Sequence, residues 1–353
     1  MRIGDARRAA ADWVARHQNG APDFLGAYLV GSTASLPDDA QLPLGSDIDV
    51  FVVHDTAAVP PKPGKVVHAG VLLDVTVLPW SAISTPDEVL TSYHLANGLR
   101  ADTILVDPSG RLRAVQRYVT EHFAEEAWVR RRCQDVAGRI ESGLDGLSGA
   151  ELSAPWHDLV TWWLFPTGQT AHVLLVAALR NPTVRLRYLA AREVLDRYGR
   201  PDLYRDLIDL LGAGDLTAAQ AERHVGALAR TFDAAAVIAK TPFPFSSDIT
   251  PAARATAIDA SLALIRAGDQ REAMFWIVAT FARCHKILAA DAPPALQREH
   301  AEAFHDAVRD IGIASTADLL ARADAVRQYL PKLRACADEI VAANAGVTRA
   351  PHA

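Results

Sequence analysis

The chain has 353 residues, half of them hydrophobic, and a formal net charge of −6. At roughly 150 residues per domain, this length predicts two domains rather than one small core. The acidic balance, without a lysine- or arginine-rich tail, argues against a nucleic-acid partner and favours a small molecule or a protein. The densest basic cluster, at residues 129–132, is typical of a solvated helix face.

Cysteine usage and the N-terminus indicate the compartment. Cys133, Cys284 and Cys336 are odd in number and lack metal-ligand spacing, so we expect reduced thiols in a cytoplasmic protein. The N-terminus lacks the apolar segment of a signal peptide. No run of about 18 apolar residues is present, so no membrane span is expected.

The first third of the chain predicts a mixed α/β unit. Residues 5–18 place apolar side chains at helical spacing and predict an amphipathic helix. Short apolar runs bounded by turn residues follow, and they predict strands at 24–30, 47–53 and 101–110 and a hairpin over 65–80 with its turn near Ala69-Gly70.

Helical periodicity dominates from Val115 onward. We expect an apolar helix that stops at Asn181-Pro182, an amphipathic helix at 184–199, a long apolar helix at 271–290, and one or two helices over 316–346 with an interruption at Pro331. The predicted fold class is therefore α+β. A small mixed-sheet domain at residues 1–120 precedes an all-helical domain at 121–345.

Two aspartates, Asp47 and Asp49, interrupt the apolar strand at 47–53. Aspartate is depleted in strands, so its presence there needs a reason. Because side chains alternate along a strand, the two carboxylates share one face, whereas Ile48 and Val50 point to the other face and into a core. Carboxylates this close repel each other unless they share a cation, and Mg²⁺ suits carboxylates combined with substrate phosphates.

A third carboxylate and a glycine-serine loop extend this site. Asp74 lies alone in the apolar run "VLLDVTVL", and three carboxylates can hold two metal ions for in-line phosphoryl displacement. Gly31-Ser32 follows the strand at 24–30 and opens a short helix at Thr33. A glycine lets a phosphate approach the backbone, and a helix N-terminus offers free N–H groups to an anion.

This set of residues resembles the DNA polymerase beta-like nucleotidyltransferase superfamily. The resemblance rests on Gly31-Ser32, then Asp47 and Asp49, then Asp74, in that order. It implies that the three aspartates bind two catalytic Mg²⁺ ions and that Ser32 holds the outer phosphates of an NTP. ATP is the first candidate for that co-substrate.

The resemblance covers roughly the first 110 residues. Ser46, directly before the aspartate pair, also fits the family pattern and would assist nucleotide binding. The spacer from Thr33 to Ser46 is longer than usual and contains Pro37 and Pro43, so we expect a short helix followed by an inserted loop.

The layout of the helical two-thirds is similar to that of aminoglycoside and lincosamide nucleotidyltransferases. It implies transfer of a nucleoside monophosphate to a small-molecule acceptor with release of pyrophosphate, and antibiotic modification is one plausible role. Glu141 follows the domain boundary and is a candidate general base. A solvated helix residue is the alternative reading of the same position.

Several other side chains have both a structural and a functional interpretation. Trp156, Trp162 and Trp163 could stack on a ligand ring, although helix–helix core packing is the simpler interpretation. His285 lacks a partner motif and is interpreted as structural or solvated. Arg187 could meet a phosphate, but a charged helix face is the simpler interpretation.

Three other functions remain open. A toxin-like nucleotidyltransferase would modify tRNA or a protein, and a non-catalytic nucleotide-binding module would keep only a relict site. A ligase-like enzyme would adenylate a carboxylate. The sequence does not indicate an oligomeric state.

Overall fold

A tight turn at Ala69 and Gly70 joins the two strands of the predicted hairpin in the computed structural model. Both residues adopt a left-handed backbone conformation, with φ of 49° and 77°, as the favoured two-residue hairpin turn requires. The turn connects β3 (Gly64–His68) to β4 (Val71–Pro79). The structure describes residues 1–18, 20–57, 62–149 and 153–349.

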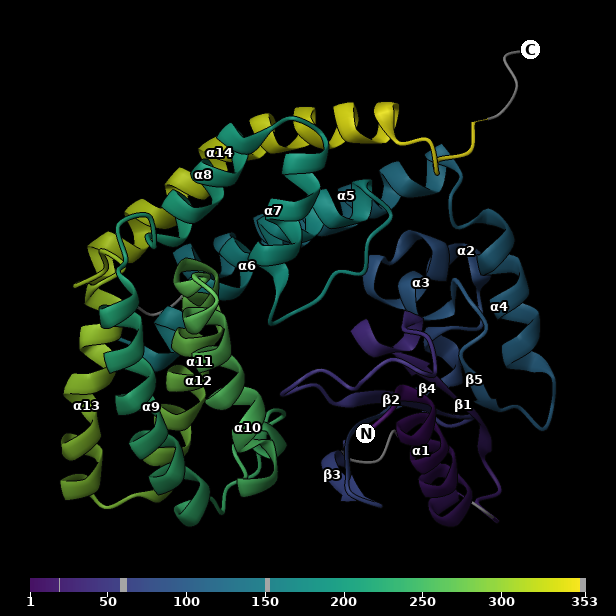
Figure 1. The fold of residues 1–353 in the computed structure, drawn as a ribbon, viewed down its shortest axis with the longest axis horizontal. Coiled ribbons are helices and arrows are strands. Elements are labelled where there is room, and N and C mark those ends of the chain that lie inside the picture. Colours follow the sequence, from purple (N-terminus) through teal and green to yellow (C-terminus); the bar gives the residue numbers. More distant parts are fainter. Residues whose placement is uncertain (19, 58–61, 150–152, 350–353) are drawn as a thin grey trace. The chain divides into compact units, whose positions relative to one another are not determined.

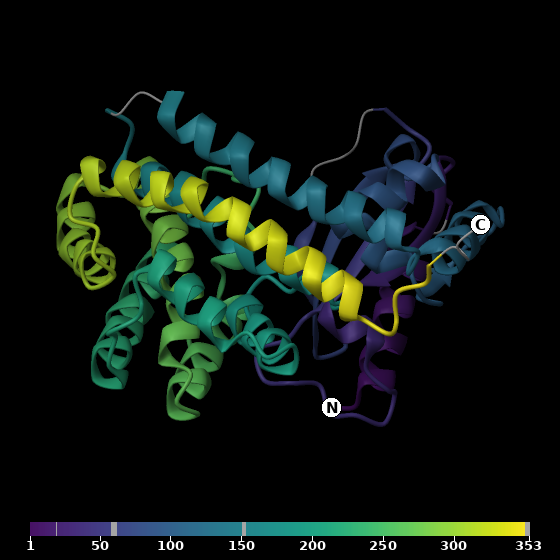
Figure 2. The ribbon, with the colours of Figure 1, turned by 90° about the horizontal axis from the view of Figure 1, so that it is seen from above.

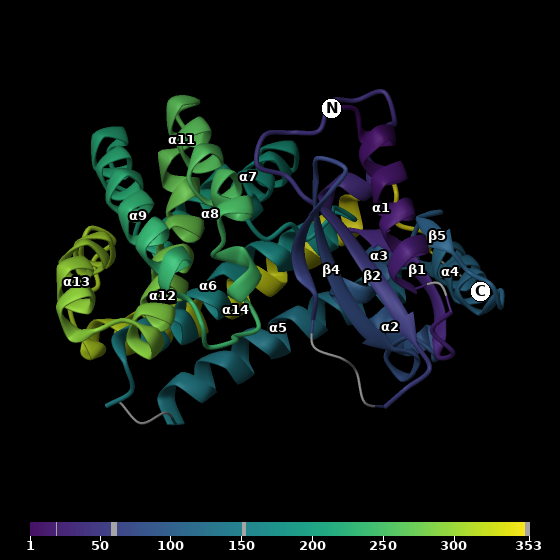
Figure 3. The same ribbon diagram turned by 90° about the horizontal axis from the view of Figure 1, so that it is seen from below.

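The sheet is mixed and has the strand order β3-β4-β2-β1-β5. Its other members are β1 (Phe24–Val30), β2 (Ile48–His54) and β5 (Ile104–Val106). β2 and β4 run parallel, whereas the remaining pairs are antiparallel. Figure 3 shows β4, β2 and β1 side by side. β5 is shorter than the predicted 101–110 strand, and Pro108, which cannot donate to a ladder, follows soon after it.

Helices cover both faces of this sheet (Figure 1). α1 (Ile3–Gln18) places Trp13 and Val14 in one core with Ile48 and Val50. The other core joins the sheet to α2 (Pro86–Thr91), α3 (Tyr93–Leu99) and α4 (Arg111–His122). The predicted alternation is confirmed, because Ile48 and Val50 face the α1 core and leave the Asp49 position on the opposite face.

The chain forms two compact units. The first comprises Met1–Arg132 and the described residues from Ala345 onward, and the second is Cys133–Asn344. The predicted division after residue 120 falls inside α4, whereas the units divide after Arg132 within α5 (Glu126–Gly149). α4 belongs to the sheet unit because its apolar face completes that core. Arg132 is 1% exposed and donates to the carbonyls of Leu90 and Phe123 in the same unit.

Every regular element in the described part of the second unit is a helix, as predicted. They are the later part of α5, α6 (Trp156–Ala177), α7 (Arg187–Arg197), α8 (Pro201–Leu211), α9 (Ala218–Ile238), α10 (Arg254–Ala257), α11 (Asp259–Arg266), α12 (Gln270–Asp291), α13 (Pro294–Arg309) and α14 (Thr316–Ala343), with single 3₁₀ turns η3 (Ser246–Asp248) and η4 (Pro251–Ala253). One more 3₁₀ turn, η2 (Trp80–Ala82), follows β4 in the sheet unit.

α12 is the core helix of the second unit. Among the described residues it is the one helix long and apolar enough to cross a membrane by length and composition. Within its most apolar window, however, 78% is buried inside the protein. Such burial is typical of a helix that is hydrophobic all round because it lies in a protein core.

The predicted interruption at Pro331 is not found. α14 is one continuous helix that contains this proline, and it begins with a capping box at Ser315. A proline inside a helix costs about 3 kcal/mol or more, so packing must offset it. Leu330 and Leu333, on either side of the proline, are 2% and 1% exposed. Figure 2 shows α14 running beside α5, to which Arg334 is tied by an ion pair.

Arg187 is buried, and its interpretation as part of a charged helix face is wrong. Its side chain is 1% exposed, and its guanidinium lies 3.8 Å from the centre of the Phe275 ring. The Arg187 Nε also donates to the carbonyl of Val184 at 2.7 Å. Core packing explains Trp163, which is fully buried, but not Trp162, which is 40% exposed.

A group of histidines surrounds His285 in the helical unit. The His285 ring stacks on Phe304 with a centroid distance of 4.9 Å. Burial, and after it the charges of the neighbouring His157, His300 and His305, lower the pKa of His285 to about 4. The neutral ring is therefore the form that the folded protein favours.

We expect acid to destabilise the wild-type protein more than the His285→Phe variant. The unfolded pKa is about 6.5, so the contribution of His285 is complete above that pH and is lost as the pH falls toward about 4. Each pKa unit corresponds to about 1.4 kcal/mol. Urea unfolding at several pH values measures the difference. His122→Gln is the control, because a hydrogen bond with Glu125 raises the pKa of His122, and equal acid sensitivity of wild type and His285→Phe contradicts the account.

Candidate metal centre

Three carboxylates converge at the edge of the sheet where β2 begins. Asp49 on β2 and Asp74 on β4 are direct partners in the parallel ladder. Asp47 precedes β2 and shares the face of Asp49. One ligand oxygen from each aspartate lies within 4.8 Å of the others, so the group could hold a metal ion.

The electrostatics of these carboxylates differ. Burial raises the pKa of Asp49 well above its usual value, and the charges of Asp47 and Asp74 raise it further. Burial also raises the pKa of Asp74, but Lys65 and Lys62 outweigh that effect and hold it below its usual value. Among the described residues, the Asp49 carboxylate forms neither a hydrogen bond nor an ion pair. Asp49 is thus the member of the group that most lacks a positive partner.

Two lysines complete the group, and neither is predicted from the local sequence pattern. The Lys65 ammonium contacts Asp47 and lies 2.9 Å from Asp74, and its side chain is only 6% exposed. Lys62 lies 2.8 Å from the other oxygen of Asp74 and is 37% exposed. Hairpin register could have located Lys65, because a two-residue turn at Ala69-Gly70 places it opposite Asp74.

Gly31 lies against the Asp49 carboxylate. It follows β1 with φ of +76°, and a Cβ at this position would lie 1.9 Å from Oδ2 of Asp49. Only glycine fits here, both in conformation and in space. Ser32 begins η1 (Ser32–Ser35), a single 3₁₀ turn where a short helix is predicted. Ser46 lies in the turn before Asp47, with its N–H donating to the carbonyl of Pro43 at 3.1 Å.

Arg7 fixes the position of this glycine-serine loop. From α1, its guanidinium donates to the carbonyls of Ala34 and Leu36 at 2.8 and 2.7 Å and to the Asp38 carboxylate at 2.6 Å. It thereby satisfies carbonyls at the end of η1 that have no partner within so short a helix. No pattern in the sequence indicates this role, since an arginine on an amphipathic helix is ordinarily solvated.

Glu141 lies on the part of α5 that belongs to the helical unit. Its carboxylate forms an ion pair with Arg334 of α14 at 2.7 Å, and both side chains are almost half exposed. A surface ion pair of this kind contributes little to stability. Its role as a general base stays a prediction.

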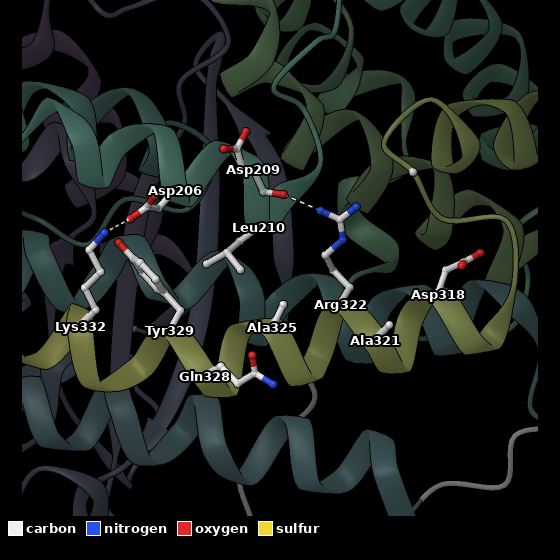
Figure 4. Close-up of a pocket in the computed structure, with 11 residues that line it drawn as sticks. Asp206, Asp209, Leu210, Asp318, Ala321, Arg322, Ala325, Gln328, Tyr329 and Lys332 are labelled. Atoms are coloured by element: carbon white, nitrogen blue, oxygen red, sulfur yellow. Dashed lines mark hydrogen bonds and ion pairs between the residues drawn. The ribbon is translucent and has the colours of Figure 1, made fainter.

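Two hollows lined by described residues of the helical unit are large enough for a small molecule. One, of about 340 Å³, lies between α5 and α6 and has a mostly apolar lining that includes Trp162 and Phe165. The other, of about 700 Å³, lies between α8 and α14 (Figure 4). In the second hollow Lys332 pairs with Asp206 at 2.6 Å, and Arg322 donates to the backbone carbonyl of Asp209.

Comparisons with known proteins add little to this geometry. No family model matches the chain, and no curated protein matches it. One similar solved structure is a nucleotidyltransferase-like protein from Exiguobacterium sibiricum 255-15. It is 12% identical, with 80% of each chain covered and a TM-score of 0.27. The chemistry of the site therefore rests on the residues of this chain.

Proposed function

We propose that this chain is a Mg²⁺-dependent nucleotidyltransferase. It transfers a nucleoside monophosphate from an NTP, with ATP the first candidate, to a small-molecule acceptor. The proposal rests on the convergence of Asp47, Asp49 and Asp74. Gly31 lies so close to Asp49 that a Cβ there would clash with its carboxylate. The order of these residues along the chain resembles that of the DNA polymerase beta-like superfamily.

The donor set fits magnesium. All three candidate ligands are carboxylates, the hard oxygen donors that Mg²⁺ prefers. Asp47 and Asp74 are 20% and 14% exposed, so part of the site stays open to phosphates. Magnesium bound there supplies charge stabilisation to the phosphoryl group in transfer. Gly31 and Ser32 supply a loop without a bulky side chain next to that position.

The reaction is a displacement at the α-phosphorus. An acceptor oxygen or nitrogen forms a bond to that phosphorus while the bond to the bridging oxygen breaks. Pyrophosphate leaves with the electron pair, and the acceptor loses its proton. The chain's contribution is to position the triphosphate and to compensate its charge.

Support for a small-molecule acceptor comes from the helical unit and from the net charge. The two hollows there have the size of small-ligand sites. The net charge of −6 does not favour a nucleic-acid acceptor. Modification of an antibiotic is one use consistent with both features.

Pyrophosphate release tests the proposal. Each of the four NTPs is incubated with Mg²⁺ and a panel of aminoglycosides, lincosamides and small carboxylic acids. We expect release that depends on one acceptor class. Carboxylic acids as the active class would indicate adenylation for ligation, and a mass shift on tRNA or protein alone would indicate a toxin-like enzyme. Bound nucleotide without turnover on any acceptor would indicate a non-catalytic module.

Glu141→Gln tests the proposed general base. Because Glu141 is already engaged with Arg334, we expect kcat to stay within about twofold of wild type. A residue that accepts the proton in the transition state would instead contribute roughly 10²–10⁴-fold. The pH profile of kcat decides between them, since loss of its acidic limb together with such a fall would establish Glu141 as the base.

Arg7→Met tests whether Arg7 positions the glycine-serine loop. Removing its bonds to Ala34 and Leu36 frees η1 to move, and we expect the KM for the NTP to rise about tenfold with a smaller change in kcat. Arg8→Met is the control, because Arg8 is 75% exposed and pairs only with Asp5 among the described residues. Equal KM values for both variants and wild type contradict the role of Arg7.

A further inference from the structure

A buried ammonium group lies within the carboxylate cluster. Lys65 is held on β3 by its pairing opposite Asp74, and its side chain is 6% exposed. Its Nζ contacts both Asp47 and Asp74. A side chain so enclosed, and fixed by strand register, is not a solvated lysine that happens to lie nearby.

The charges of the cluster are partly compensated before any metal binds. Three carboxylates face two ammonium groups, those of Lys65 and Lys62, which leaves one net negative charge. One divalent cation then brings the cluster to the same total charge that two divalent cations would give to three carboxylates alone. The lysines therefore supply the charge of one magnesium ion.

The space around the Lys65 ammonium also favours a single metal ion. A second ion between Asp47 and Asp74 would lie against the Lys65 ammonium, and like charges repel strongly in a partly buried site. Asp49 forms no ion pair among the described residues and is left for a metal ion.

We propose that this site binds one divalent cation with its nucleotide, and that the Lys65 ammonium stands in the place of a second. The inference rests on the proposed function, and it replaces the two ions implied by the resemblance with one. Lys62, at 37% exposed, adds to the same positive charge from the solvent side.

The number of bound ions tests the proposal without turnover. Mn²⁺ and the non-hydrolysable α,β-methylene analogue of ATP are titrated into the full chain. Equilibrium dialysis with electron paramagnetic resonance counts the Mn²⁺ bound per bound analogue. We expect one ion for wild type and two for Lys65→Met. Lys65→Arg, which keeps the charge, and Lys240→Met, which removes an exposed lysine, are both expected to bind one.

Each outcome decides. Two ions per bound analogue in wild type would overturn the inference and leave the proposed function intact. One ion in a folded Lys65→Met variant would show that Lys65 does not stand in for the second. Should Lys65→Met fail to fold, the wild-type and Lys65→Arg ratios still decide. If wild type binds neither Mn²⁺ nor the analogue, the proposed function falls and this inference with it.

Discussion

Replacing Asp49 with asparagine is expected to lower turnover by about 10³-fold or more and to raise the thermal stability of the metal-free protein. The loss of turnover follows from removing a negative charge at the centre of the proposed metal site, where charge stabilisation is typically worth about 10²–10³-fold per group. The gain in stability follows because Asp49 lies beside Asp47 and Asp74 and has no ion-pair partner among the described residues.

The pH dependence of that gain is specific. Burial and then the neighbouring carboxylates raise the pKa of Asp49 in the folded state, so the folded protein binds a proton that the unfolded chain has released. Stability therefore falls as the pH rises above the unfolded value of about 3.9 and levels off above the folded pKa. The advantage of Asp49→Asn is expected to be large at pH 7 and small near pH 4.

Thermal unfolding at both pH values, with a metal chelator present, measures the effect. Asp39→Asn is the control, because Asp39 is an exposed aspartate outside the cluster. It should change neither turnover nor melting temperature appreciably. Wild-type turnover in Asp49→Asn, or a variant less stable than wild type at pH 7, contradicts the role assigned to Asp49.

Gly31→Ala is the second change with a large expected effect. Its Cβ would lie 1.9 Å from Oδ2 of Asp49, and φ is +76°. The loop or the carboxylate must move to admit the methyl group, and a misplacement of about 1 Å can cost roughly 10²-fold in rate. We expect turnover to fall by about 10²-fold and Mn²⁺ binding to weaken in parallel.

Gly110→Ala separates backbone strain from steric clash. Gly110 has nearly the same φ, +74°, but a Cβ there would meet nothing within 4 Å. Both variants should therefore lose similar stability through the unfavourable φ, and only Gly31→Ala should lose metal affinity. Equal metal affinity in the two variants would show that the contact with Asp49 is unimportant.

The sheet and the three aspartates can be predicted from the sequence because both depend on local patterns. Apolar residues at alternate positions around Asp49 and Asp74 identify buried strands. Because side chains alternate along a strand, Asp47 and Asp49 must lie on the same face. The turn at Ala69-Gly70 is equally local, since its two left-handed residues match the hairpin rule.

Features that depend on contacts between residues far apart in the sequence cannot be predicted from local patterns. Arg7 supports η1 from another helix, and Arg187 lies buried over Phe275, yet each resembles an ordinary charged helix residue in sequence. Pro331 is a strong local signal for a helix end, but tertiary packing of α14 overrides it. The position of Lys65 lies between these two cases. No motif indicates it, but the register of the hairpin places Lys65 opposite Asp74.

Transfer of an isotopic label tests the central claim most directly. ATP labelled at the α-phosphorus or at the γ-phosphorus is incubated with Mg²⁺, the active acceptor and either wild type or Asp49→Asn. The account predicts that wild type moves the α label to the acceptor and releases the γ label in pyrophosphate, and that Asp49→Asn does neither. Movement of the γ label to the acceptor, or equal α-label transfer by both proteins, would contradict a nucleotidyltransferase centred on these aspartates.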